Sequence, residues 1–183
     1  GKTSYTYTAD GRIASVTQTN LLAPSPATNL NQIRTTTYTY AKHANGMLAT
    51  MTENGPLLGN GDAVTRNFNT TGDLISVSNS LGHTVTYASH NALGQPGRVT
   101  GVNGDITDYT YDTRGRTIRV RTYPNGSTAA DTTYAYKSNG LLDSITSPDG
   151  QARRYQYDAA HRLITESEPE VGGTYALKEY AYN

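Results

Sequence analysis

Residues 107–121, TDYTYDTRGRTIRVR, have the pattern of two short strands joined by a polar turn. Side chains in a strand point alternately to its two faces, so the first run places Tyr109 and Tyr111 together on one face. Residues 112–115 supply the turn, because an Asp side chain can bond the backbone two residues on and Gly115 tolerates a positive φ. The second run is β-branched and polar, as a half-buried strand is. The stretch therefore predicts a β-hairpin.

The composition of the whole chain favours an all-β fold. Its 183 residues include 29 Thr, 15 Tyr and 18 Gly, against one Phe and no Trp, and these residues suit pleated surfaces and tight turns. Charged residues make up 16% and sum to zero, so neither a nucleic-acid partner nor a polybasic membrane contact is expected. There is no cysteine, no apolar run near the roughly 18 residues of a membrane span, and no signal-peptide core in this segment.

The hairpin pattern recurs along the chain, anchored on a glycine. The seven anchors are Gly11, Gly46, Gly72, Gly94, Gly115, Gly140 and, in the glycine position of the last copy, His161. The aromatic residues before them are Tyr5 and Tyr7, Tyr38 and Tyr40, Phe68, Tyr109 and Tyr111, Tyr134 and Tyr136, and Tyr155 and Tyr157, and Tyr180 opens a truncated eighth unit. The basic step of about 21 residues fits two strands and two tight turns. We therefore predict an antiparallel β-hairpin meander forming a curved, spiralling sheet of roughly 14 to 16 strands, with the tyrosines in stacked rows.

Insertions explain the longer steps between anchors. Residues 21–31, 55–62 and 125–131 are predicted to be loops, and the second unit is assigned two extra residues in its turn. Asn-Gly and Asp-Gly pairs favour type I′ turns, which need a positive φ at both central residues. The apolar residues two and five places after each glycine are three apart. Either a bulge re-aims one of them, or both faces carry apolar groups.

No catalytic, cofactor or metal site is predicted. The histidines lack metal-ligand spacing and are interpreted as structural substitutions: His43, His83, His90 and His161. Three recurrent carboxylates are expected to form Asx turns, each with an arginine partner across the hairpin: Asp10 with Arg12, Asp112 with Arg116, and Asp158 with Arg162. The acidic run around Pro169 is expected to be a solvated loop: Glu166, Glu168 and Glu170.

The unit Tyr-x-Tyr-(Asp)-x-x-Gly-Arg-(Leu/Ile) resembles the YD repeat of the Rhs family, most clearly at residues 5–13, 109–117 and 155–163. The family includes bacterial Rhs polymorphic toxins, C components of insecticidal toxin complexes, wall-associated proteins and animal teneurins. Its repeats form a sheet that spirals into a hollow shell, which in the toxins encloses a C-terminal effector domain. The pattern fails at Arg66, Ala88 and His161, and the chain lacks the Asp-Pro pair of the family's self-cleavage segment.

The resemblance implies that residues 1–183 are a YD-repeat array, a structural wall segment of a longer bacterial protein, secreted or at the cell surface. It implies no enzymatic activity and no cofactor. The partners would be the rest of its own shell and an enclosed C-terminal effector domain. The alternative is a carbohydrate- or cell-surface-binding module, because Tyr offers an apolar ring with a polar tip to glycans. Bare edges at the first and last strands would favour edge-to-edge self-association.

Overall fold

The computed structural model describes residues 1–20, 33–57, 59, 61–124, 128–169 and 175–182. In this part of the chain there are fifteen β-strands, and they follow one another in chain order. Every strand pairing within the two compact units, Gly1–Gly94 and Gln95–Asn183, is antiparallel. The all-β antiparallel meander predicted from the sequence is therefore confirmed.

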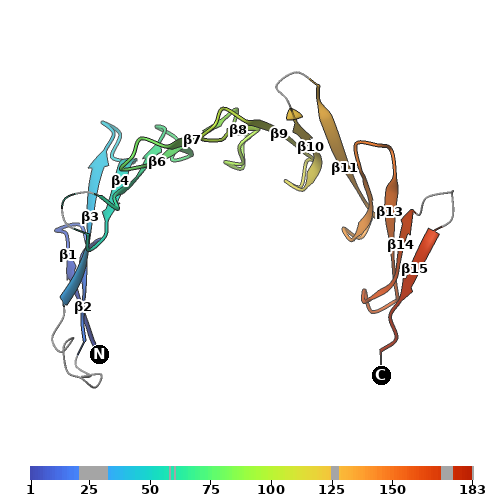
Figure 1. Cartoon of the computed structure of the whole chain (residues 1–183), viewed down its shortest axis with the longest axis horizontal. Helices are drawn as coiled ribbons and strands as arrows, with labels where there is room; N and C mark the ends of the chain where they lie inside the picture. The colour runs from blue at the N-terminus through green and yellow to red at the C-terminus, as the bar shows by residue number, and fades with distance from the viewer. Residues whose placement is uncertain (21–32, 58, 60, 125–127, 170–174, 183) are drawn as a thin grey trace. The chain divides into compact units, whose positions relative to one another are not determined.

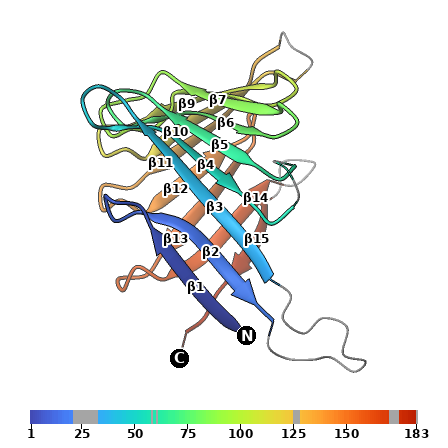
Figure 2. The same ribbon diagram turned by 90° about the vertical axis from the view of Figure 1, so that its left-hand side faces the viewer.

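The first unit contains the first seven strands, which Figure 1 colours from blue to green. They are β1 (Lys2–Tyr7), β2 (Ile13–Thr19), β3 (Ile33–Lys42), β4 (Leu48–Asn54), β5 (Val64–Phe68), β6 (Leu74–Asn79) and β7 (Thr84–Ala88). Figure 2 shows β1 to β5 side by side in this order. Each strand therefore pairs with its neighbours in the sequence.

The second unit contains the remaining eight strands. They are β8 (Arg98–Thr100), β9 (Ile106–Tyr111), β10 (Thr117–Thr122), β11 (Ala130–Tyr136), β12 (Leu142–Thr146), β13 (Ala152–Tyr157), β14 (Leu163–Pro169) and β15 (Tyr175–Glu179). Residues 107–121 thus lie in β9 and β10, with the turn between these strands where Asp112 and Gly115 predict it.

Each unit is a single layer of sheet without a conventional core. No described side chain is fully buried. On the aromatic face the tyrosines of β3, β9, β11 and β13 are half-buried, as Tyr134 is, while neighbours on the other face such as Ala135 are exposed. Tyr5 and Tyr7 of β1 are exposed. In the first unit the other face carries mainly hydroxyl and amide side chains. One row of them crosses five strands: Thr39, Thr52, Thr65, Ser78 and Thr84. Each unit is therefore amphipathic from face to face.

The anchor turns are three-residue turns with a bulge, and the prediction of type I′ turns is wrong. At residues 112–116 the Gly115 N–H donates to the Asp112 carbonyl at 3.0 Å, and the Asp112 N–H donates to the Arg116 carbonyl at 2.9 Å. Only the glycine has a positive φ, +77°, whereas a type I′ turn needs two such residues. A type I turn followed by one left-handed residue has this pattern, and glycine takes the left-handed place without steric cost.

A bulge after each anchor explains the three-residue spacing of the apolar positions. In the β1–β2 pair, Tyr5 faces Val16 but Tyr7 faces Ile13, so Ala14 is the extra residue. The bulge therefore places both apolar residues on the face of the two tyrosines. The same register shift follows five other anchors whose flanking strands pair with each other: Gly46, Gly72, Gly115, Gly140 and His161. Of the two alternatives that the sequence leaves open, the bulge is correct.

The two extra residues of the second hairpin lie in its first strand, β3, and not in its turn. Strand β3 has ten residues and ends at Lys42, which holds the place before the turn that Tyr7 holds in the first hairpin. The turn at residues 43–47 has the ordinary length, so the assignment of extra turn residues is wrong. Of the predicted loops, residues 21–31 lie outside the described part, as do 58, 60 and 125–127. Residues 55–62 join β4 to β5, and the third loop ends earlier than predicted because β11 begins at Ala130.

Candidate functional site

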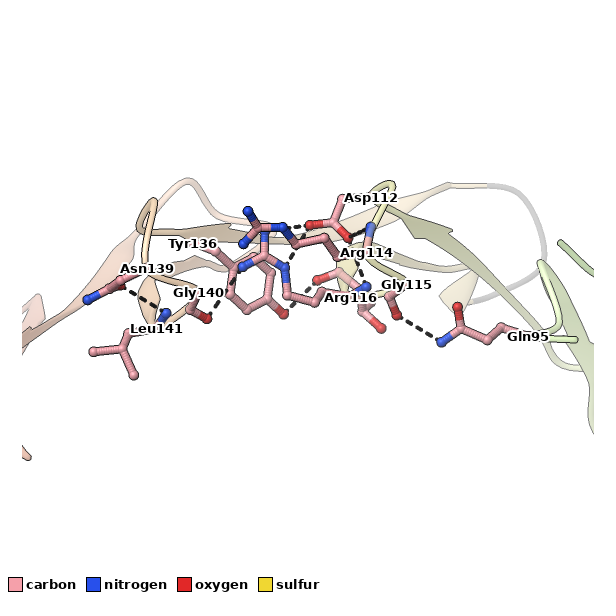
Figure 3. A network of polar contacts seen from close by, with 10 residues as sticks. Gln95, Asp112, Arg114, Gly115, Arg116, Tyr136, Asn139, Gly140 and Leu141 are labelled. Atoms are coloured by element: carbon pink, nitrogen blue, oxygen red, sulfur yellow. Dashed lines mark hydrogen bonds and ion pairs between the residues drawn. The ribbon is translucent and has the colours of Figure 1, made fainter. Parts of the chain in front are cut away.

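The residues of the repeat motif meet in a contact between successive hairpins, which we name the latch. Figure 3 shows its fullest example, between the turn at residues 112–116 and the next hairpin. The Arg116 backbone N–H and Nε donate to the Asp112 carboxylate at 2.9 and 2.7 Å. The same guanidinium lies 4.2 Å from the Tyr136 ring centroid, a cation–π distance. The Tyr136 hydroxyl donates to the Thr117 carbonyl at 2.9 Å. Arg116 therefore serves its own turn and the following repeat.

Two further latches have the same chemistry. Arg12 lies 5.2 Å from the Tyr40 ring centroid, and Arg162 lies 4.7 Å from that of Tyr182. Arg162 is held by Asp158, with Nε 2.7 Å from the carboxylate. In all three latches the arginine directly follows the anchor residue. The Gly-Arg pair of the repeat motif thus has a physical role: it carries a cation onto the aromatic ring of the next unit.

The latch tyrosines all lie in the same register relative to the preceding hairpin. Four hydroxyls donate to the carbonyl two residues after the preceding anchor: Tyr40 to Ile13 (2.9 Å), Tyr111 to Pro96 (2.9 Å), Tyr136 to Thr117 (2.9 Å) and Tyr182 to Leu163 (2.7 Å). In each case the residue four before the tyrosine pairs with the residue five after that anchor, as Thr132 pairs with Val120. Within the β9–β10 hairpin, Val120 faces Tyr109, two before the latch tyrosine. The next hairpin is therefore staggered by two residues.

The residue after an anchor also reaches the next anchor glycine. Two side chains donate to that glycine's carbonyl: Gln95 to Gly115 at 2.8 Å and Arg116 to Gly140 at 3.4 Å. In the first unit, a Cβ on Gly72 would lie 2.9 Å from Met47 Cε. Two features therefore favour glycine at position 72: its φ of +94°, and the Met47 side chain, which lies where a Cβ would stand.

The turn carboxylates are kept in their charged form. The Asp112 carboxylate accepts from the backbone N–H groups of Arg114 and Arg116, both at 2.9 Å, as the predicted Asx turn requires. The backbone N–H of Arg116 is the first cause of a lowered Asp112 pKa, and its guanidinium adds to it. The backbone N–H of Arg162 likewise lowers the pKa of Asp158. Both predictions of Asx turns at these positions agree with the structure.

Asp10 differs from the other two, and its prediction as an Asx-turn former is wrong. Thr8 holds the first turn position, and its Oγ1 accepts from the Arg12 N–H at 3.1 Å. Asp10 stands beside the anchor glycine, where it pairs with Lys42 at 2.8 Å and lies 3.5 Å from Arg12. The hydrogen bond from Lys42 is the main reason that the pKa of Asp10 falls to about 2. Its carboxylate therefore links the first turn to β3.

The other face of the second unit carries a ladder of alternating charge. Arg98, Asp108, Arg121 and Asp131 are successive cross-strand neighbours in β8 to β11. Arg98 binds Asp108 through Nε and Nη2 at 2.6 and 2.9 Å, and Arg121 binds Asp131 at 2.6 and 2.7 Å. The Tyr123 hydroxyl donates to Asp108, whose pKa falls to about 2 chiefly through the bond from Arg98. Bidentate pairs on facing residues favour this register over a slipped one.

Within each hairpin the predicted tyrosines share one face, but they do not form stacked rows. Tyr5 faces Val16, and Tyr134 faces Ile145. Among the described residues one aromatic pair is in contact, Tyr109 with Tyr111, at 6.3 Å between ring centroids. The residue opposite the first tyrosine is aliphatic for Tyr5, Tyr109 and Tyr134 and a glutamate for Tyr38 and Tyr155. The stagger moves the next hairpin's tyrosines out of the row.

Glu166 and Glu168 lie in β14, so the prediction of a solvated loop is wrong for them, while Glu170 lies outside the described residues. Arg153 of β13 contacts their carboxylates at 3.5 and 2.6 Å. A cation on the neighbouring strand makes an acidic run compatible with a sheet. The sequence offers this partner 13 and 15 positions away, a distance that only the β13–β14 pairing explains.

Two of the histidines, His43 and His161, have structural roles. His43 Nε2 lies 2.9 Å from the Phe68 carbonyl of the next hairpin, and His161 adopts the left-handed φ of +65° in the anchor position. In the described part of the chain, no three His, Asp or Glu side chains gather as a metal site needs. Nor does that part contain a helix long and apolar enough to cross a membrane.

Comparison with known proteins adds the evolutionary context. Residues 136–170 match the RHS Repeat family. The toxin subunit YenC2 of Yersinia entomophaga is 33% identical over an alignment of 103 residues, and the match covers 46% of this chain and 11% of that protein. The TcdB2-TccC3-Cdc42 crystal structure is similar with a TM-score of 0.69 at 20% identity, over 97% of this chain and 10% of that one. The Photorhabdus luminescens Tc holotoxin pore gives 0.64 at 20%, over 86% and 8%.

The two structural likenesses show a shared fold, and the chain spans about a tenth of the length of the proteins that it matches. The family match falls on the sixth and seventh copies of the hairpin, where β12, β13 and β14 lie. Taken with the repeated motif and its latch, these findings confirm the resemblance to the Rhs/YD-repeat family that the sequence predicted.

Proposed function

We propose that this chain is a structural wall segment of an Rhs-type shell, and that the full-length protein encloses a C-terminal effector domain behind that wall. The observation that carries the proposal is the latch. One short motif closes a turn and binds the next hairpin, so the sheet grows hairpin by hairpin without a core. Repeat arrays of this kind are stabilised by contacts between neighbouring units. The likeness to a toxin subunit and to TcdB2-TccC3 supports the same role.

The register supports a wound wall. In the second unit, each latched hairpin advances by two residues toward its turns relative to the hairpin before it. A regular stagger of one sign tilts the strands, and tilt is what a closed or spiralling sheet requires. A flat sheet would not need it. The proposal also implies a secreted or cell-surface protein, with toxin-complex components and the enclosed domain as its partners.

The alternative, a carbohydrate- or surface-binding module, has less support. Tyr40, Tyr111 and Tyr136 already donate their hydroxyls to backbone carbonyls, and two of these rings lie under arginines. The hydroxyls of these tyrosines, and the ring faces under arginines, are therefore already engaged and less available to bind a sugar. The exposed Tyr5 and Tyr7 form a small platform. Signals on a glycan array that disappear with Tyr7→Ala would favour the alternative.

The wall proposal is tested by limited proteolysis of the full-length protein. Deletion of residues 130–151, one hairpin and its connecting turn, should open a gap or misalign the wall. We expect the segment that follows the repeats to be cleaved at least about tenfold faster than in the intact protein, because a protease cleaves only what it reaches. Arg114→Ala is the control, since its side chain is exposed and outside the latch. If the intact protein is cleaved there equally fast, nothing is enclosed.

A further inference from the structure

The second and third hairpins meet without the stagger of the latches. Arg66 of β5 faces Met51 of β4, the fifth residue after its anchor, and Arg66 lies two residues before the aromatic Phe68. In the latches, the residue that faces this position lies four before the aromatic. Without that two-residue shift, the turns at residues 43–47 and 69–73 come side by side.

A thioether takes part in the contact between these two turns. Met47 directly follows its anchor glycine, as Arg116 does in its own turn. The Cε of Met47 lies 2.9 Å from the place that a Cβ on Gly72 would take. In the same contact, the Asn45 side-chain amide donates to the Thr70 carbonyl at 2.8 Å. A flexible, polarizable thioether fills irregular gaps of this kind. An apolar side chain therefore holds the position that a guanidinium holds in the latch.

Met47 is also accessible to small reagents. It is 43% exposed, whereas Met51 is half-buried within β4. The chain has these two methionines and no cysteine, so its sulfur chemistry is confined to thioethers. Oxidation converts a methionine from a flexible apolar side chain into a polar sulfoxide and disrupts the apolar contacts that it makes. An exposed thioether that packs against a neighbouring turn is therefore a point at which an oxidant can alter the structure.

We propose that Met47 is an oxidation site, and that its sulfoxide loosens the contact between the turns at residues 43–47 and 69–73. The co-reactant is a peroxide. A lone pair on the Met47 sulfur attacks one peroxide oxygen and forms the S–O bond, while the O–O bond breaks and the departing hydroxide takes a proton and leaves as water. The sulfur loses two electrons, and hydrogen peroxide gains them.

The polar product disfavours the contact that the thioether makes. The sulfoxide oxygen must stay hydrated or find a hydrogen-bond donor, because burying it without one is unfavourable. The side chain then packs less well against Gly72, and the two turns are held mainly by the bond from Asn45 and the contact of His43. The inference goes beyond the role of a wall segment and does not depend on what the wall encloses.

Treatment of the intact chain with hydrogen peroxide, followed by peptide mass spectrometry, tests the choice of residue. We expect Met47 to gain one oxygen atom at least about threefold faster than Met51, because Met47 is the more exposed of the two. In concentrated urea the two rates should become equal, since unfolding exposes both side chains. Equal rates in the folded chain would overturn the assignment of Met47 as the oxidation site.

Hydrogen exchange tests the structural effect, with the amides of the β9–β10 hairpin as the internal reference for folding. The Met51→Leu variant keeps Met47 as its one thioether. Its oxidation should speed exchange of the Asn69 and Gly72 amides, which donate within the neighbouring turn, by about two- to fivefold. Reduction by methionine sulfoxide reductase should restore the original rates.

Two substitutions at position 47 separate polarity from reagent damage. Met47→Gln places a polar group there without peroxide and should raise the exchange of the same two amides. Met47→Leu keeps an apolar side chain that peroxide does not oxidise, so it should not respond to the treatment. Unchanged exchange after oxidation of Met47, or an equal rise in peroxide-treated Met47→Leu, would overturn the inference.

Discussion

Removal of the latch arginine at residue 116 is the most direct test of what holds the sheet together. Arg116→Ala loses a cation–π contact at 4.2 Å to a half-buried ring, which contributes about 1 kcal/mol. It also loses a long hydrogen bond to the Gly140 carbonyl, which adds about 0.5 kcal/mol. The Asp112 ion pair adds little, because solvent screens it. The sum is about 1.5 kcal/mol, or a drop in Tm of about 3–6 °C for a chain of this size.

The assay is urea and thermal unfolding followed by far-UV circular dichroism, with Arg114→Ala as the matched control. Arg114→Ala removes the same charge two residues away. The Arg114 side chain is exposed, and only the backbone N–H of this residue donates within the turn. We expect that variant to stay within about 0.5 kcal/mol of the parent chain. A cycle with Tyr136→Leu should give a coupling energy of about 1 kcal/mol between the two positions.

The reasoning is refuted if Arg116→Ala and Arg114→Ala destabilise the chain equally. It is also refuted if the cycle shows no coupling between positions 116 and 136. Either result would mean that the guanidinium and the ring are neighbours without a mutual attraction. The hairpins would then be held by backbone pairing alone, and the Gly-Arg pair of the motif would need another explanation.

Local chemistry made the strands and the meander predictable. The alternation in residues 107–121 and the Asp and Gly between its two runs act within a few residues, and the structure has β9, a turn and β10 in those places. The bulge was visible as an inconsistency, since Ile13 and Val16 cannot share a face in a regular strand. What the spacing could not decide was whether the chain bends there or exposes both faces.

The turn type was mispredicted because an Asn-Gly pair suits two kinds of hairpin. In both kinds the glycine is left-handed, and they differ in the number of loop residues and in the φ of the residue before the glycine, which is positive only in the type I′ turn. A signal was present at Gly115 and His161, where no Asn or Asp directly precedes the anchor. There the Asp stands three residues before it, at Asp112 and Asp158, as a type I turn favours.

Of the contacts that form the latch, only the one within a single turn was predictable from the sequence. The pairing of Arg116 with Asp112 is local and was expected, but the Tyr136 ring lies 20 residues further along, and its position depends on the stagger between hairpins. That stagger is a property of pairing between repeats and leaves no mark within one repeat. Lys42 and Gln95 were missed for the same reason, because their partners belong to a neighbouring turn.

Three further outcomes are expected. His161→Gly should raise stability by about 1 kcal/mol, seen as a higher Tm, because glycine removes the strain of a left-handed side chain at φ +65°. Gly72→Ala should lower it by about 1–2 kcal/mol, since it adds that strain at φ +94° and meets Met47, and an unchanged Tm would contradict both assignments. Stability should also depend on pH through the turn and ladder carboxylates. The pKa values of Asp10 and Asp108 are lowered from 3.8 to about 2 by Lys42 and Arg98, so folding favours their charged forms. Their contribution is complete above the unfolded value and is lost as the pH falls through the folded one. The urea midpoint should therefore stay level from about pH 7 to 5 and fall between about pH 4 and 2. Asp108→Asn should flatten that fall, and a loss already present between pH 7 and 5 would show that histidines, and not these ion pairs, control the acid response.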